Sequence, residues 1–115
     1  MAPELAIQVQ KTLGVVLSGS SLKGDKVVNH LGEDLGKIEE IMLDLEHGRI
    51  AYAVLSFGGF LGMGEKDVAI PFSDVHASEK NNKWYLVLNT TKDALKTAPG
   101  FTYDKTRTTW IPAAK

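Results

Sequence analysis

Residues 24–71, GDKVVNHLGEDLGKIEEIMLDLEHGRIAYAVLSFGGFLGMGEKDVAIP, decide the fold of this chain. Two amphipathic strand patterns follow each other here, joined by the short turn Glu46-His47-Gly48, whose glycine suits the left-handed position of a hairpin loop. A loop that mixes glycine with large apolar side chains, residues 56–64, comes next, and a further short strand ends the stretch. Short paired strands of this kind predict a small β structure.

The first strand of the hairpin has one break in its pattern. Apolar residues alternate from Ile41 to Leu45, but Ile38 is out of phase with them by one residue. A β-bulge near residues 39–40 restores the phase. A helix is the alternative, because this run contains good helix formers, but the adjoining run of residues 49–57 is plainly a strand and favours pairing. Strict alternation in that run places Ile50, Tyr52, Val54 and Ser56 on one face and Ala51, Ala53, Leu55 and Phe57 on the other.

The remaining predicted elements are short. Composition predicts a loop at residues 18–21 and a turn at residues 29–34. Thr91 is a suitable N-cap for a short helix that Pro99-Gly100 ends. The tail from Phe101 carries aromatic residues and is expected to dock on the rest of the molecule. The other predicted strands are residues 13–17, 26–29, 67–72, 74–78 and 84–89, the last two forming a hairpin.

These short strands favour a sandwich or barrel over alternating strands and helices. Pro71 lies near the end of its strand, which predicts an edge strand or a strand terminus at that point. A chain of 115 residues fits one domain of this kind.

Composition restricts the function. The chain has 13 basic and 14 acidic residues, so it lacks the basic footprint that phosphate neutralisation leaves in nucleic-acid-binding proteins. It has no cysteine, which excludes disulfides, thiol catalysis and cysteine-ligated zinc, and fits a reducing compartment. No apolar stretch approaches the ~20 residues of a membrane span. The first residues lack the features of a secretory signal, so we expect a cytoplasmic protein.

The loop of residues 56–64 is the feature that the strands do not explain. Its glycines and the following Lys66 suggest a phosphate cradle, but Glu65 and Asp67 repel an anion there, and a strand follows instead of a helix. The apolar side chains of the loop either cap one end of the fold or form a contact surface. We predict an interaction site, and self-association into a homodimer through this loop or an adjacent sheet edge. The predicted site residues are Phe57, Phe60, Leu61 and Met63.

No combination of residues indicates catalysis, a cofactor or a metal. His30, His47 and His76 occur in separate turns or strand starts without metal-ligand spacing. Asp44 and Glu46 supply too few oxygens for calcium. We therefore expect a non-enzymatic protein without a cofactor. The alternative function is an RNA- or ribosome-associated factor, in which aromatic residues stack on single-stranded RNA. The candidates for stacking are Trp84, Tyr85, Tyr103 and Trp110.

The residues around the hairpin resemble the PRC-barrel family, a small β-barrel named after the photosynthetic reaction-centre H subunit. The loop of residues 56–64 resembles that of stand-alone bacterial members in particular. The resemblance implies an SH3-like barrel that serves as an adaptor. The matching positions are Leu22, Gly24, Val27, Asn29, residues 32–38, 44–45, Gly48, residues 50–54 and residues 70–72.

The chain departs from two better-known roles in that family. We expect it to lack the transmembrane helix of the H subunit and the additional N-terminal domain of a ribosome maturation factor, and the family supplies no catalytic residues. We therefore expect an interaction module with a protein partner that the sequence does not identify. The expected organisation is an N-terminal extension at residues 1–16, a PRC-barrel domain at residues 17–89, and a helix and tail at residues 90–115 that pack on the barrel.

Overall fold

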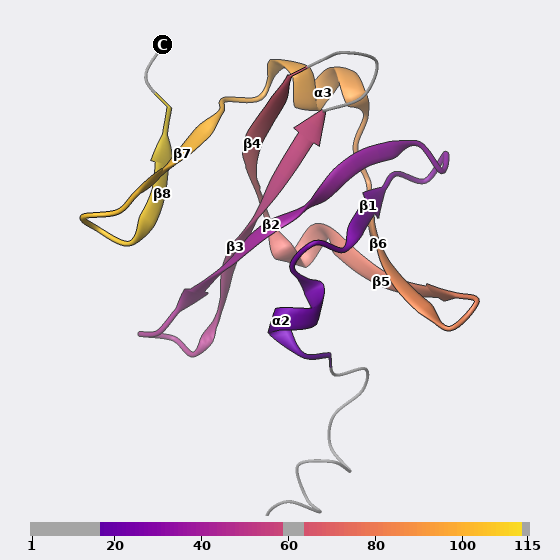
Figure 1. Cartoon of the computed structure of the whole chain (residues 1–115), viewed down its shortest axis with the longest axis horizontal. Coiled ribbons are helices and arrows are strands. Elements are labelled where there is room, and N and C mark those ends of the chain that lie inside the picture. Colours follow the sequence, from indigo (N-terminus) through magenta and orange to yellow (C-terminus); the bar gives the residue numbers. More distant parts are fainter. Residues whose placement is uncertain (1–16, 59–63, 114–115) are drawn as a thin grey trace, which may run out of the picture.

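The computed structural model describes residues 17–58 and 64–113 and is mainly β (Figure 1). This confirms the predicted fold class, including the short helix near the C-terminus. In chain order the elements are α2 (Gly19–Leu22), β1 (Lys26–Val28), β2 (Asp34–Asp44), β3 (Arg49–Gly58), β4 (Glu65–Ile70), the 3-10 helix η1 (Phe72–Asp74), β5 (Val75–Lys80), β6 (Lys83–Leu88), α3 (Lys92–Thr97), β7 (Phe101–Asp104) and β8 (Thr109–Pro112).

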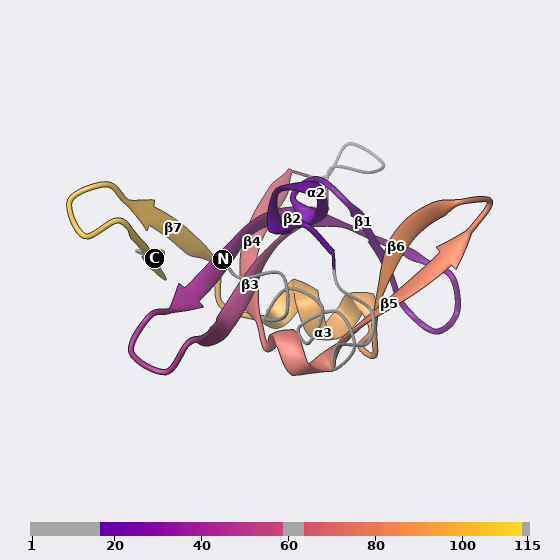
Figure 2. The ribbon, with the colours of Figure 1, turned by 90° about the horizontal axis from the view of Figure 1, so that it is seen from below.

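Six of the strands form one sheet in the order β4-β3-β2-β1-β6-β5, and β7 and β8 pair separately. Only the β1–β6 pairing is parallel among these strands. The sheet curves strongly, so that β4, β3 and β2 lie on one side of a central space and β6 and β5 on the other (Figure 2). The terminal strands β4 and β5 are joined through η1 but are not paired with each other. The fold is thus a partly open form of the predicted barrel, with β4 at an edge as Pro71 indicated.

The core lies inside this curved sheet. Buried side chains from five strands form one cluster, to which α2 adds Leu22 and α3 adds Leu95. The largest fully buried side chains include Phe57, Leu35 and Leu55. Burying a side chain of this size contributes about 1.5–3 kcal/mol to folding. A single continuous cluster is what one domain requires.

The β2–β3 hairpin contains the bulge that the sequence predicted. Ile38 pairs with Leu55, and Glu40 pairs with Val54, so that Glu39 has no direct partner in β3. The extra residue brings Ile38 onto the same face as the apolar residues that follow it in β2. The helix alternative for this run is therefore wrong.

A second bulge in the same hairpin was not predicted. Met42 pairs with Tyr52, but the next residue, Leu43, pairs with Ile50, so that Ala51 is the extra residue. Directly paired residues have their side chains on the same face of a ribbon. Ile50 therefore shares a face with Leu43 and not with Tyr52. The prediction that side chains alternate strictly along β3 is therefore wrong at Ala51.

The N-terminal part of the described chain also differs from the prediction. Residues 18–21 were expected to form a loop, but α2 makes one helical turn there. The Ser21 backbone N–H and hydroxyl both donate to the Ser18 carbonyl oxygen, at 3.0 and 2.7 Å, and Leu22 is buried in the core. Of the predicted strand at residues 13–17, only Leu17 is described, and it lies outside any strand.

The other predicted elements are present with shifted ends. The strand predicted at residues 67–72 begins earlier and ends earlier, as β4. The β5–β6 hairpin turns at Asn81 and Asn82, whose φ values of 54° and 63° are typical of a two-residue hairpin turn. Thr91 caps α3 as predicted, because its hydroxyl oxygen accepts a hydrogen bond from the Ala94 N–H at 3.1 Å.

The C-terminal tail forms the β7–β8 hairpin, which projects from one side of the molecule (Figures 1 and 2). It contacts the sheet through β4. The Tyr52 hydroxyl also donates to the Trp110 carbonyl oxygen at 3.4 Å. Tyr103 and Trp110 pair across the hairpin with their rings edge to face, 5.6 Å apart.

Candidate interaction surface

The outer part of the β2–β3 hairpin extends beyond its neighbouring strands. β1 pairs only with the first residues of β2, up to Lys37, and β4 pairs only with the end of β3 from Ala53 onward. Residues 40–52 therefore form a two-stranded ribbon, which points to the lower left in Figure 1. We call this segment the ribbon.

One face of the ribbon is apolar along its whole length. Ile41 packs against the core, and the second bulge places Leu43 and Ile50 on the same face beyond it. Their side chains are 62% and 37% exposed, and Leu45 in the turn is 85% exposed. The apolar strip, which we define as Ile41, Leu43, Leu45 and Ile50, thus runs from the core out into solvent. Exposed apolar side chains that lie together in this way are typical of contact surfaces.

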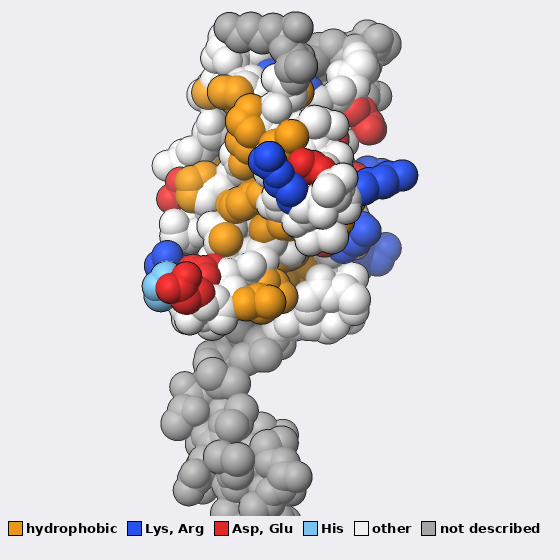
Figure 3. Space-filling view, turned by 90° about the vertical axis from the view of Figure 1, so that its left-hand side faces the viewer, with side chains coloured by type: hydrophobic (Ala, Val, Ile, Leu, Met, Phe, Trp, Pro, Cys, Tyr) orange, Lys and Arg blue, Asp and Glu red, His pale blue; other side chains and the backbone are white. Residues whose placement is uncertain are grey.

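Two hollows adjoin the strip and share Ile50. One, of about 320 Å³, lies at the ribbon's end beside Leu43 and Leu45. The other hollow, of about 340 Å³, we call the groove. Figure 3 shows hydrophobic side chains gathered on the side of the molecule from which the β2–β3 and β7–β8 hairpins project. The lining of the groove is apolar and comprises Leu17, Leu22, Ile50, Phe72, Val75, Ala77 and Leu86.

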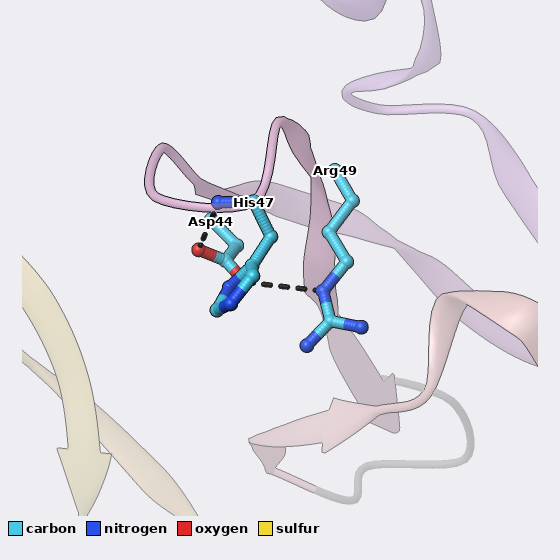
Figure 4. A network of polar contacts seen from close by, with 3 residues as sticks. All are labelled: Asp44, His47 and Arg49. Atoms are coloured by element: carbon cyan, nitrogen blue, oxygen red, sulfur yellow. Dashed lines mark hydrogen bonds and ion pairs between the residues drawn. The ribbon is translucent and has the colours of Figure 1, made fainter.

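A polar network holds the turn at the end of the ribbon (Figure 4). Asp44 Oδ2 lies 2.8 Å from His47 Nδ1 and accepts a hydrogen bond from Arg49 Nε at 3.0 Å. Asp44 Oδ1 accepts from the His47 backbone N–H at 3.2 Å. The hydrogen bond from the His47 side chain lowers the pKa of Asp44, and the His47 N–H and Arg49 add to this effect. The network fixes the turn that carries Leu45.

The predicted interaction residues do not all lie in the described parts of the chain. Phe57 is in β3, and its side chain is a core group that is only 1% exposed. Phe60, Leu61 and Met63 lie outside the described residues. Their role in an interaction stays a prediction. The apolar strip was not singled out from the sequence, because a strand pattern alone does not show how far a hairpin extends past its neighbours.

Lys66, the lysine that follows the glycine loop, is bound within the protein. Its Nζ donates to the carbonyl oxygens of Lys96 and Ala98 at 2.8 and 2.7 Å. These are carbonyl groups at the C-terminal end of α3, where a positive charge is favourable. Lys66 therefore attaches α3 to β4. Because its ammonium group donates to these two carbonyl oxygens, it is engaged within the protein and not held for a phosphate.

The other candidate groups from the sequence are dispersed. Within residues 17–58 and 64–113, no three His, Cys, Asp or Glu side chains lie together in a way that could hold a metal ion. Trp84 and Tyr85 are consecutive in β6 and so point to opposite faces, while Tyr103 and Trp110 lie on the β7–β8 hairpin at the other side of Figure 1. The four rings are not brought together into one surface.

No helix in the described part of the chain has the length and apolar character needed to cross a membrane.

Comparison with known proteins supports the resemblance found in the sequence. The family model for the PRC-barrel domain matches residues 14–95, which is most of the chain. The match begins before the boundary expected from the sequence and extends through most of α3. A search among curated proteins found no match.

Proposed function

This chain belongs to the PRC-barrel domain family, and from this premise we propose that it is a non-enzymatic interaction module that self-associates through the apolar strip of its ribbon. The second copy places its own strip against the first, so that the contact is the same on both sides, as in most homodimers. The family supports the role of a small interaction module. The observation that carries the proposal is the exposure of Leu43 and Leu45, 62% and 85%, at the end of a strip that begins in the core.

The ribbon is well suited to such a contact. Its backbone is held by the β2–β3 pairing, and its turn is held by the network around Asp44. Little conformational freedom is therefore lost when the strip is covered, which favours association. Covering a leucine side chain of this kind contributes about 1.5–3 kcal/mol. The RNA-associated alternative has no comparable observation in its favour among the residues described.

The experiment is sedimentation equilibrium of the wild-type protein, Leu45→Asp and Leu31→Asp. Leu31 is a matched control, because it is 82% exposed but lies in the turn between β1 and β2, away from the strip. We expect a wild-type dimer, a Leu31→Asp dimer of equal affinity, and an affinity about 10- to 100-fold lower for Leu45→Asp. Circular dichroism checks that all three are folded.

Three results would contradict the proposal. A wild-type monomer at all concentrations would exclude self-association. Equal weakening by Leu31→Asp and Leu45→Asp would show a general effect of charge. Phe60→Asp is measured in the same way as a fourth protein, and weakening by Phe60→Asp but not by Leu45→Asp would place the contact on the glycine loop, as the sequence predicted, and not on the strip.

A further inference from the structure

We propose that the outer face of β2, β1, β6 and β5 binds an acidic peptide segment of a partner protein. Carboxylates of the peptide meet four lysines on this face, and one apolar side chain of the peptide enters a hollow between them. This surface is separate from the apolar strip, so the inference goes beyond the self-association proposed above. We call it the basic face and define it by Lys26, Lys37, Lys80 and Lys83.

The basic face contains two pairs of lysines that lie directly opposite each other. Lys26 of β1 pairs with Lys37 of β2, and Lys80 of β5 pairs with Lys83 of β6. Directly paired residues have their side chains on the same face of a sheet, and like charges in this position are destabilising. In the described part of the chain, the only ion pair of these lysines joins Lys26 Nζ to Asp34 Oδ2 at 3.3 Å. The repulsion is a cost to the fold, and a bound anion relieves it.

The hollow on this face, which we call the basic hollow, has an apolar base. Its volume is about 530 Å³, and it lies between the β1–β2 turn and the β5–β6 hairpin, which both point to the right in Figure 1. Val28 pairs with Val87 across the parallel contact, and Tyr85 precedes Val87 by two residues and so shares its face. These three side chains are half-buried, while Val27 and Leu86 on the opposite face belong to the core. The charged side chains that line the basic hollow are Lys26 and Lys80.

The turn beside the basic hollow uses three of its backbone amides internally. Asn29 Oδ1 accepts from the N–H groups of Leu31 and Glu33, both at 3.0 Å. The Gly32 N–H donates to the Asn29 carbonyl oxygen at 3.0 Å. A compact phosphate is usually held by converging backbone amides, whereas the positive charge here comes from side chains on four strands. Four strands span about 14 Å at a spacing of about 4.8 Å, which an extended peptide covers with about four residues.

The surroundings favour a protein partner over a nucleic acid. Carboxylates border the basic face and repel phosphates, since Asp34 pairs with Lys26 and Glu33 Oε1 accepts from Asn29 Nδ2 at 2.8 Å. Binding of single-stranded RNA typically stacks successive bases on several rings. In β6, only the ring of Tyr85 is on this face, because its neighbour in the strand points the other way. A short acidic segment with one apolar side chain matches lysines around a single hollow.

A synthetic peptide tests the proposal. The probe is a fluorescein-labelled heptapeptide with a central leucine between two runs of acidic residues, and fluorescence anisotropy at low ionic strength measures its Kd. Lys80→Glu reverses a charge at the basic hollow, and the matched control Lys105→Glu makes the same change at an exposed residue between β7 and β8. We expect Lys80→Glu to bind the probe about 5- to 10-fold more weakly than the wild type, and Lys105→Glu to bind it equally well. Circular dichroism checks that both variants are folded.

Two further measurements separate the hollow from the charges and from the strip. A second peptide with glycine in place of the leucine should bind about tenfold more weakly, because the apolar contact is lost. Leu45→Asp should bind the leucine peptide as the wild type does, because Leu45 lies on the apolar strip, so peptide binding and self-association are tested independently.

Any of five results would overturn the proposal. The wild type might fail to bind the leucine peptide, or Lys80→Glu and Lys105→Glu might weaken binding equally, which would show a general effect of net charge. Equal Kd values for the two peptides would show that the basic hollow takes no side chain. Weaker binding by Leu45→Asp would place the peptide on the strip. Tighter binding of a single-stranded RNA of the same net charge would make the basic face a nucleic-acid surface.

Discussion

Replacing Gly36 with alanine should disrupt the middle of the sheet. Gly36 lies in β2 and pairs with Val27 of β1 on one side and with Phe57 of β3 on the other. Its φ is +130°, a region that residues with a side chain rarely adopt. A Cβ at this position would overlap the Ser56 carbonyl oxygen and lie 3.2 Å from the Phe57 Cα. These are backbone atoms, so they cannot rotate away.

The expected loss has two parts. Holding a residue other than glycine in such a backbone conformation costs about 1–3 kcal/mol. Moving the neighbouring strand away to make room costs about another 1–3 kcal/mol, as in an overpacked core. The total of about 2–6 kcal/mol is a large share of the 5–15 kcal/mol that typically stabilises a domain. We therefore expect Gly36→Ala to be mostly unfolded at 37 °C or to have a sharply lower Tm.

Gly32→Ala is the control that separates the two parts. Gly32 has a φ of +79°, but no atom lies within 4 Å of the position that its Cβ would take. Only the backbone cost applies there, about 1–2 kcal/mol. Urea unfolding followed by circular dichroism gives both free energies. If Gly36→Ala lost no more stability than Gly32→Ala, the close approach of β2 and β3 at Ser56 would be refuted.

Two further changes test the contacts of β4. Lys66→Met keeps the aliphatic stem of the side chain but removes its hydrogen bonds to α3, and should lower the free energy of unfolding by about 1–3 kcal/mol. Chemical denaturation measures this free energy. The control Lys96→Met loses only an exposed ion pair and should change the free energy of unfolding little. Burial, with Glu39 and Glu65 nearby, raises the pKa of Asp67, so at pH 7 the folded state carries a charge that it disfavours. Asp67→Asn should therefore raise Tm at pH 7 and give no gain near pH 3, where the carboxyl is protonated in both states; an equal gain at both pH values would exclude the charge as its cause.

The sequence predicted those features of the fold that local patterns encode. The bulge at Glu39 followed from the phase error of Ile38, and the cap at Thr91 from the residue type. The second bulge was missed because Ile50, Ala51 and Tyr52 all suit a strand, and only the pairing with β2 shows which residue is extra. The turn of α2 was missed because serine and glycine are typical of loops, whereas the burial of Leu22 is a tertiary effect.

The candidate surface was less accessible to prediction. The sequence drew attention to the glycine loop, but Phe57, which begins its apolar series, belongs to the core. The carbonyl partners of Lys66 lie 30 and 32 residues further along the chain, so no local pattern signals them. Leu43 and Leu45 read as core residues of a strand. They are exposed because the pairing of β1 and β4 with the hairpin ends before the ribbon begins. The residues around Leu43 and Leu45 do not show how long the neighbouring strands are.

The parallel pairing of β1 with β6 has a consequence for how the chain folds. Val27 pairs with Leu86, so β1 finds its second neighbour in the sheet about 60 residues later in the chain, and closing so long a loop is entropically unfavourable. Other contacts must form first to offset this cost. During synthesis, β2, β3 and β4 can pair as soon as they emerge, but the side of β1 that faces β6 stays open until the β5–β6 hairpin has been made. The late strands β5 and β6 therefore complete the sheet that β1 begins. Pairings this distant in sequence are expected to limit the folding rate.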